Sequence, residues 1–195
     1  MGFGDLLYQH IPNSKQTPAE KMTRLPQTRL VTAGILGLIG SWLYLLSAFQ
    51  IYYAFLPVGA GFAFAASFSL AMVAIAYGTG HAAYYAIVSS AKVAKGNNLD
   101  IKSAGKMGAA LFSRIVLITY IPVAVSMLLM LYVILSGRST YPRWMVIFLP
   151  NMPYLLRMPI QKILRGRAHE LIRASYDNFV LLVFFVLSTI VLWIK

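Results

Sequence analysis

The sequence predicts an all-α fold, a polytopic transmembrane helix bundle. It is expected to form a single integral membrane domain over residues 1–195, with the bundle itself in residues 30–194. The chain is 59% hydrophobic and 11% charged, whereas soluble domains carry about 25% charged residues. Residues 30–91 contain no Asp, Glu, Lys or Arg, and because one span needs about 20 apolar residues, this stretch has room for two. The 17 Lys and Arg residues lie mostly between the apolar segments.

Residues 1–29 are predicted to be the remnant of a helix followed by a cytoplasmic linker. Met1–Tyr8 is apolar apart from Asp5, but eight helical residues rise only about 12 Å and do not cross a hydrocarbon core of about 30 Å. We therefore expect a six-helix design that lacks its first helix, with five spans in this chain. Residues 9–29 contain three prolines and four basic residues, which predicts a polar linker.

Two spans are expected in the charge-free stretch, over residues 30–56 and 59–90, with a hinge at Pro57–Gly61. The first span has Gly37 and Ser41 four residues apart, a spacing that lets membrane helices approach closely. The second span is longer than a crossing requires, which predicts tilt or an extension into the cytoplasm.

A third span is expected over residues 111–136, after a basic loop at 91–110. Arg114 lies near its inner end, where a long side chain can reach the headgroups. Segment 141–158 is expected to be the fourth span, although its charge-free core is short and contains two prolines. It is either a kinked, tilted helix or a helix broken around a binding site.

The last span is expected over residues 176–194, after a basic stretch at 159–175 that suits a helix lying on the inner leaflet. This stretch is either a site for a lipid headgroup or ordinary positive charge beside a membrane. Of the 17 Lys and Arg residues, 14 fall on the side of the bundle that holds residues 9–29, 91–110 and 159–175. Cytoplasmic loops carry such an excess, so these three loops are predicted to be cytoplasmic.

The formal net charge of +12 does not indicate a nucleic-acid-binding protein, because such proteins gather basic residues on one solvated face. Here the basic residues adjoin long apolar segments. The expected partners are therefore membrane lipids, with anionic headgroups at the basic loops. The first 25 residues contain no signal-peptide pattern, and the expected location is the cell membrane.

Cofactor and metal sites are not expected. The chain has no cysteine, and it contains no G-x-S-x-G, Walker A or H-E-x-x-H motif. His10, His81 and His169 fall far apart in the predicted topology, so they do not form a three-histidine metal site.

His81 is the central candidate for a functional residue, because it lies within the charge-free stretch and ionisable groups inside membranes are often functional. Residues three and four positions away share its helix face, so Tyr77, Tyr84 and Tyr85 are candidate substrate-binding residues. His81 is either an acid, base or ligand inside a cavity, or a neutral histidine hydrogen-bonded to a neighbouring helix.

Two carboxylates and two amides complete the candidate site, and the predicted topology brings Asp5, His81 and the Asp177–Asn178 pair together in the cytoplasmic half. Asp5 is either a buried catalytic carboxylate or a solvated residue of a loose tail. Asp177 is either catalytic or a cap at the start of the last helix. Asn178 is a candidate substrate-binding residue. Asn151, between two prolines, either binds substrate or satisfies freed backbone groups.

Four short motifs resemble an uncharacterised family of small bacterial multi-pass membrane proteins: Gly4–Tyr8, Gly80–Tyr84, Pro142–Trp144 with Pro150, and Tyr176–Phe179. The resemblance covers most of the chain. It implies that the Gly-Asp-Leu-Leu-Tyr element closes a first transmembrane helix and that the membrane is a bacterial inner membrane. More distantly, the Gly-Asp near a first helix and the later histidine are similar to lysoplasmalogenase-like membrane hydrolases.

Two functions follow as expectations. The first is a membrane-embedded enzyme that acts on a lipid or another hydrophobic substrate, with His81 and a carboxylate as an acid–base pair. The second is a non-catalytic bundle that binds a partner or passes a small solute. Convergence of His81 and a carboxylate at one cavity distinguishes the first from the second.

Overall fold

A computed structural model describes residues 2–9, 18–150, 159–160, 162–164 and 166–194, and within these residues every regular element is a helix. In chain order the elements are α1 (Gly2–Gln9), α2 (Pro18–Met22), α3 (Gln27–Phe55), the 3-10 helix η1 (Leu56–Val58), α4 (Ala60–Gly96), α5 (Ile101–Ser136), the 3-10 helix η2 (Arg143–Phe148) and α7 (Gly166–Trp193).

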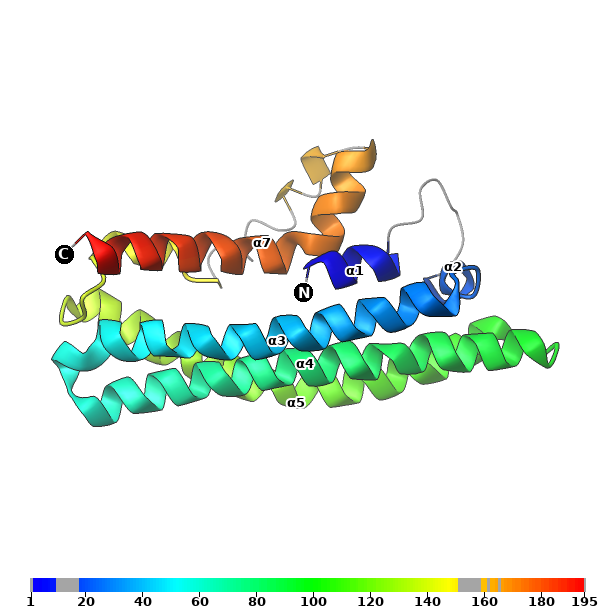
Figure 1. The fold of residues 1–195 in the computed structure, drawn as a ribbon, viewed down its shortest axis with the longest axis horizontal. Coiled ribbons are helices and arrows are strands. Elements are labelled where there is room, and N and C mark those ends of the chain that lie inside the picture. The colour runs from blue at the N-terminus through cyan, green and yellow to red at the C-terminus, as the bar shows by residue number, and fades with distance from the viewer. Residues whose placement is uncertain (1, 10–17, 151–158, 161, 165, 195) are drawn as a thin grey trace.

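The long helices α3, α4 and α5 run side by side along the long axis of the molecule, while α1 and α7 lie over one face of this row (Figure 1). Helix α4 packs against both α3 and α5, and α1 packs against α3 and α7. The connection between α3 and α4 and the C-terminus of α7 lie at one end, which we call the outer end. The connection between α4 and α5 lies at the opposite, inner end (Figure 1).

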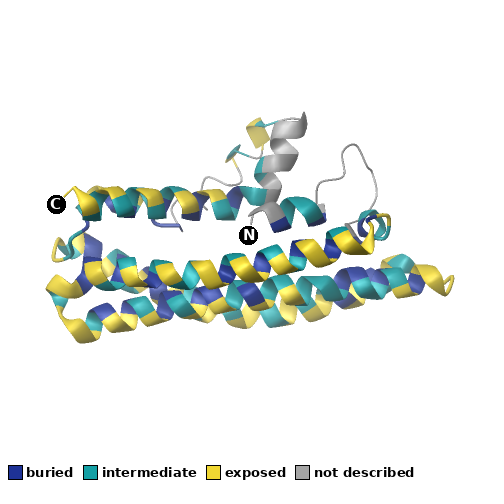
Figure 2. Ribbon diagram, in the orientation of Figure 1, coloured by how far each residue is buried: buried dark blue, intermediate teal, exposed yellow. Residues whose placement is uncertain are grey.

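Four helices of the described chain are long and apolar enough to cross a membrane, which indicates a membrane protein. They cover Gln27–Val58, Ala60–Gly96, Ile101–Ser136 and Ser175–Trp193. Large apolar side chains are exposed on their outer faces, as expected for lipid-facing surfaces; Figure 2 shows these faces in yellow.

The prediction of five spans is corrected, because segment 141–158 supplies no spanning helix among the described residues. Its described part contains η2, a 3-10 helix of 6 residues, which is only about 12 Å long at about 2 Å per residue. Pro142 precedes η2 and Pro150 follows it closely, and a proline removes the backbone N–H that a longer helix requires. Residues 151–158 lie outside the described part of the chain.

Helices α4 and α5 extend well beyond a hydrocarbon core of about 30 Å, since their 37 and 36 residues rise about 55 Å each. Helix α5 begins ten residues before the predicted span, so residues 101–110, which were predicted to be loop, are helical. Helix α5 begins directly after Asp100, whose Oδ1 accepts from the Lys102 backbone N–H at 2.9 Å. The lysines of this region are exposed on helical faces, so they mark a membrane boundary and not a helix end.

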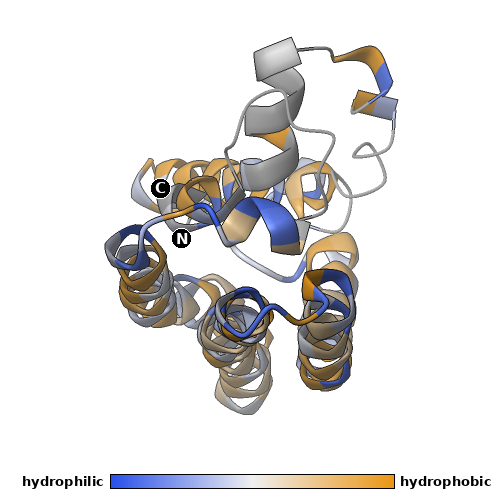
Figure 3. Cartoon of the chain, turned by 90° about the vertical axis from the view of Figure 1, so that its right-hand side faces the viewer, coloured by the Kyte–Doolittle hydropathy of each residue, from blue (hydrophilic) through white to orange (hydrophobic). Residues whose placement is uncertain are grey.

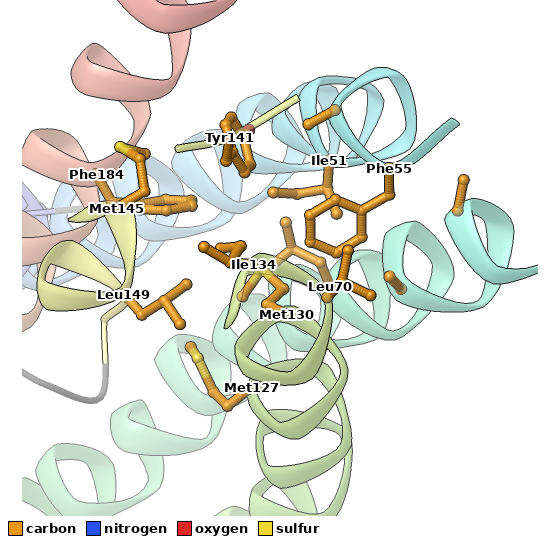
Figure 4. Packing of buried hydrophobic residues seen from close by; sticks show 14 of the residues in the cluster. Ile51, Phe55, Leu70, Met127, Met130, Ile134, Tyr141, Met145, Leu149 and Phe184 are labelled. Carbon is orange, nitrogen blue, oxygen red and sulfur yellow. The ribbon is translucent and has the colours of Figure 1, made fainter. Parts of the chain in front are cut away.

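The outer end contains the main apolar core, formed by buried side chains of α3, α4, α5, α7 and the η2 region (Figure 4). We call this cluster the outer core. Its fully buried members include Ile51, Phe55, Met130, Ile134, Tyr141, Met145 and Phe184.

Helices α1 and α2 close the inner half of the bundle. The Arg29 Nε donates to the Leu7 carbonyl at 2.9 Å, and the Lys92 Nζ donates to the Leu25 carbonyl at 2.8 Å. Tyr8 is buried against this region. The segment that was predicted to be apolar at the start of the chain forms α1, which packs on the bundle, and the segment that was predicted to be a linker contains α2.

Candidate functional site

Helix α1 reaches the bundle through glycine contacts with α3. A Cβ atom added to Gly4 would lie 2.7 Å from the backbone oxygen of Ala33. A Cβ at this distance would force the backbones apart, so glycine is required for the approach. Gly34, on the same helix as Ala33, meets the Tyr8 hydroxyl at 3.3 Å from its ideal Cβ position. The small residues of α3 therefore allow α1 to pack closely against it, and this contact holds Asp5 next to the interior of the bundle.

The His81 ring occupies space that a second glycine of α3 leaves open. A Cβ added to Gly37 would lie 2.5 Å from His81 Cγ and 2.6 Å from its Nδ1. The Nδ1 edge of the ring is therefore packed against α3, which leaves Nε2 to face another partner. The side chain of His81 is 10% exposed. The predicted small-residue pair Gly37 and Ser41 is used here, since Ser41 meets Gly78 of α4 in the same way.

Asp5 lies between a histidine of α4 and an amide of α7. Its Oδ1 is 3.6 Å from His81 Nε2, and its Oδ2 accepts from Asn178 Nδ2 at 2.7 Å. The Asp5 side chain is 21% exposed, twice the fraction of His81. We call Asp5, His81 and Asn178 the triad; it joins three helices that are far apart in the sequence.

The environment of Asp5 favours its protonated form. Burial raises the pKa of the Asp5 carboxyl from 3.8 to about 6, since removal from water disfavours the charged form. The hydrogen bond from Asn178 opposes this rise, and the charge of Asp177 adds slightly to it. A carboxyl group with such a pKa can both accept and donate a proton near neutral pH.

Asp177 lies inside α7, eleven residues after the helix begins at Gly166. The explanation of Asp177 as an N-terminal cap is therefore wrong, because the helix starts earlier than predicted. The loose-tail interpretation of Asp5 is also wrong, since Asp5 lies in α1 with both carboxylate oxygens near partners.

The three predicted tyrosines make different contacts. The Tyr84 ring packs edge-on against Tyr8 and Phe112, each at 5.2 Å between centroids. The Tyr85 hydroxyl accepts from Gln27 Nε2. Tyr77 packs against the outer core, and its ring lies 6.5 Å from that of Tyr44.

The remaining predicted site residue, Asn151, lies outside the described residues. No group of three His, Cys, Asp or Glu side chains in the described part of the chain is placed to hold a metal ion.

Two contributors to the site were not predicted as functional, Tyr8 and Gly37. Tyr8 lies three residues after Asp5 on α1, a spacing that places both on one helix face. It is 1% exposed, and its hydroxyl has no hydrogen bond within the described structure. The spacing of Gly37 and Ser41 in the sequence indicated a close helix contact. The sequence does not show that His81 is the side chain that fills the space beside Gly37.

The distance of the triad from the outer end of α4 can be compared with the thickness of a hydrocarbon core. His81 follows the start of α4 at Ala60 by 21 residues, which corresponds to about 32 Å along the helix. If the outer membrane boundary is at Ala60, a core of about 30 Å ends near His81. Basic residues of α2, α4 and α5 lie further toward the inner end, where Figure 3 shows hydrophilic segments facing the viewer.

Comparison with known proteins assigns a family but no activity. The model of DUF6796, a family of unknown function, matches residues 1–195, and the chain belongs to this family. Comparison with curated proteins and with solved structures gives no match. The family assignment agrees with the resemblance to an uncharacterised family. Neither the parallel with lysoplasmalogenase-like hydrolases nor a bacterial source gains support from it.

Proposed function

We propose that this family member is a membrane-embedded enzyme in which Asp5 transfers a proton while water cleaves a lipid or another hydrophobic substrate. The observation that carries the proposal is the position of the Asp5 carboxylate between His81 and Asn178. General acid–base catalysis is most efficient when the pKa of the catalytic group lies near the working pH. The pKa of about 6 for Asp5 meets this condition.

The three side chains have different roles in this proposal. Asn178 holds Oδ2 of Asp5 and so fixes the orientation of the carboxylate. Oδ1 takes a proton from the attacking water and returns one to the leaving oxygen. His81 positions Oδ1 and shares its proton through Nε2. The sequence predicted His81 and a carboxylate as an acid–base pair, and the greater exposure of Asp5 supports the carboxylate as the member of the pair that meets the substrate.

With the outer membrane boundary at Ala60, the triad falls near the inner edge of the hydrocarbon. The bonds that join acyl chains to a headgroup lie at this edge, which supports a lipid as the substrate class. The basic inner end supports anionic headgroups as neighbours, since Lys21, Lys92, Lys95 and Lys102 all belong to the helices that meet there. The proposal places this end on the cytoplasmic side of a cell membrane.

One observation favours the alternative, a non-catalytic bundle that binds a partner or passes a small solute. The triad joins α1, α4 and α7, and His81 is only 10% exposed. In that case the triad is a polar clamp that holds α1 in place.

The test is product formation by the purified protein in nanodiscs that contain a mixture of natural phospholipids and lysophospholipids, followed by mass spectrometry. D5N is expected to lower the rate by at least 100-fold, within the range for loss of a general acid or base. D100N is the matched control, because Asp100 is exposed and caps α5, and asparagine caps a helix equally well. Absence of product from the wild-type protein, together with a lower stability of D5N, would favour the clamp.

A further inference from the structure

Two arginines lie at the outer end, where α5 leads into η2. Arg138 belongs to the connection between these helices, and Arg143 is the first residue of η2 (Figure 1). Pro142–Trp144 is also one of the sequence motifs that the proposed function does not use. The excess of Lys and Arg in cytoplasmic loops does not account for these arginines, because they lie at the opposite end of the bundle from the lysines of α4 and α5. Their positions require a separate explanation.

The backbone between the two arginines is anchored by buried contacts. The Thr140 N–H donates to the Ala54 carbonyl of α3 at 2.8 Å. Tyr141 is 1% exposed, and its ring packs edge-on against Phe55; Figure 4 shows this ring among the side chains of the outer core. The Tyr141 hydroxyl shares a hydrogen bond of 2.5 Å with Ser188 of α7. The two arginines flank this anchored pair, so their backbone is held in place before any ligand binds.

Both guanidinium groups contact the last turn of α5 or its cap. The Arg138 guanidinium lies over the Tyr132 ring, 5.8 Å from its centroid, and its Nη2 donates to the Tyr132 hydroxyl at 2.9 Å. Its Nε donates to Ser136 Oγ at 3.4 Å. The Arg143 guanidinium packs on Gly137, where its Nη2 lies 3.0 Å from the position of an added Cβ. Ser136 and Gly137 are consecutive, with Cα atoms about 3.8 Å apart, so the two positive charges gather at one helix end.

The two positive charges have no acidic side chain beside them in the sequence or at the same level of α7. The five Asp and Glu residues are at positions 5, 20, 100, 170 and 177. The last two precede Ser188 of α7 by eleven residues or more, which is about 16 Å along the helix. The C-terminal end of α5 contributes only about half a negative elementary charge. The end of α5 therefore keeps a net positive charge of about 1.5.

Donor groups are also available for a ligand. A guanidinium group has five N–H donors. Arg138 uses two of its nitrogens for the bonds to Tyr132 and Ser136, and Arg143 donates no hydrogen bond within the described part of the chain. A ligand with negative charge and several acceptor oxygens matches this arrangement.

The arginines lie at the level of lipid headgroups when the outer membrane boundary is at Ala60. The Tyr132 ring packs 6.2 Å from that of Phe62, which lies about 3 Å inside Ala60 along α4. Gly137 follows Tyr132 by five residues, about 8 Å further out, and so lies about 5 Å outside the boundary. The headgroup layer on each side is about 5–8 Å thick. Trp144 is 46% exposed, and tryptophan is enriched in this layer.

We propose that Arg138 and Arg143 bind the phosphate of an anionic phospholipid in the leaflet at the outer end. Guanidinium groups form strong, often bidentate, hydrogen bonds to phosphate oxygens. A lipid with an ammonium headgroup is disfavoured, because none of the five acidic side chains belongs to this region. A headgroup with a net negative charge is therefore selected over a zwitterionic one. The site lies at the opposite end of the bundle from the triad, and it does not depend on the proposed function.

The first test uses the fluorescence of Trp144, which adjoins Arg143, to report the lipid beside the site. W42F and W193F remove the other two tryptophans, which are 58% and 85% exposed. The protein is placed in phosphatidylcholine membranes that contain a small fraction of phosphatidylglycerol with brominated acyl chains, which quench tryptophan. Brominated phosphatidylcholine at the same fraction is the reference. Phosphatidylglycerol is expected to be enriched at least three-fold beside Trp144.

The enrichment is expected to disappear in R138Q/R143Q. R24Q/R114Q is the matched control, because it removes the same charge from two other exposed positions, and it should keep the enrichment. Inorganic phosphate at constant ionic strength should not relieve the quenching. Equal quenching by the two brominated lipids before the arginines are changed, or equal losses in the two double variants, would overturn the proposal. Relief by inorganic phosphate would identify a soluble anion as the ligand and would overturn the assignment to a lipid.

A single variant separates binding from folding. R143Q removes no hydrogen bond of the described structure, so its unfolding midpoint in SDS should equal that of the parent protein. It is expected to lower the enrichment of phosphatidylglycerol at least two-fold, because one of the two guanidinium groups is lost. Enrichment in R143Q equal to that of the parent protein would contradict the proposal.

Discussion

In the outer half of the bundle, apolar side chains from α3, α4, α5 and α7 pack directly against one another, whereas in the inner half α1, α4 and α7 meet through a carboxylate, an imidazole and an amide. The outer contacts depend on close packing of apolar side chains, and such packing does not change with pH. The inner contacts depend on the close approaches that Gly4 and Gly37 allow. They also depend on the protonation state of Asp5. The comparison separates the part that holds the bundle together from the part that can respond to a substrate or a proton.

The largest effect is expected from emptying the outer core. Phe184 is 0% exposed and packs against Tyr141 and Phe185. F184A should lower the free energy of unfolding by about 3–5 kcal/mol, the range for buried phenylalanine. The matched control is F179A, since Phe179 lies on the same helix but is 61% exposed. Unfolding in mixed micelles with increasing SDS measures both. A loss for F179A as large as that for F184A would contradict the assignment of the core.

The next largest effect is a dependence of the stability on pH, which comes from Asp5 in the inner half. Because the pKa of Asp5 is raised from 3.8 to about 6 in the folded protein, the folded state holds its proton over a range where the unfolded state has released it. Stability is therefore highest below about pH 4 and falls as pH rises to about 6, by about 2–3 kcal/mol for this group. D5N should remove this fall.

Unfolding measured between pH 4 and pH 8 checks this prediction. D100N provides the comparison, because Asp100 is exposed and its replacement should leave the fall unchanged. If D5N and the wild type lose the same stability between pH 4 and pH 7, Asp5 is not the group responsible.

A smaller loss of stability is expected when the space beside Gly37, which the His81 ring occupies, is filled. G37A places a Cβ 2.5 Å from the imidazole and should destabilise the protein by about 1–3 kcal/mol through overpacking. G80A adds the same atom beside His81 in sequence, where no atom lies within 4 Å. It should be neutral or stabilising, since alanine favours helix by up to about 1 kcal/mol over glycine. Limited proteolysis of the α1 region, with the unfolding curves, measures both variants, and equal behaviour would argue against the close packing beside Gly37.

The smallest effect is expected at the end of α1. The Arg29 Nε donates to the Leu7 carbonyl from a half-buried position, so R29A should cost about 1 kcal/mol. R24A removes the same charge from an exposed position and should change stability by less than about 0.5 kcal/mol. Amide hydrogen exchange in α1 should rise in R29A only.

Several features were predictable from the sequence because they depend on local composition. The charge-free stretch at 30–91 predicted the pair of helices α3 and α4, and the lysines after it predicted a polar inner end. The approach of Asp5, Asn178 and His81 followed from topology, and the distances agree with it. The catalytic and substrate-binding roles of the site residues remain predictions.

Other features depend on tertiary contacts that a linear pattern does not contain. The start of α5 at Ile101 depends on the cap at Asp100, which outweighs the nearby lysines. The length of segment 141–158 suggested a helix, but its prolines allow only the short η2 among the described residues. Asp5 is more exposed than His81 because the His81 ring fills the space beside Gly37 of α3. A sequence pattern does not show which side chain fills that space.

The central claim is that Asp5, held by His81 and Asn178, has a pKa raised from its ordinary value to about 6. The most direct measurement is carbon-13 NMR of protein labelled at the aspartate carboxyl carbons, titrated from pH 3 to pH 9. The chain has three aspartates, at positions 5, 100 and 177, and D5N identifies the Asp5 signal by its loss. The account predicts a pKa of about 6 for Asp5, with a further rise in N178L, because that variant removes the hydrogen bond that favours the charged form. A pKa near the ordinary value of about 4, unchanged in N178L, would contradict the account.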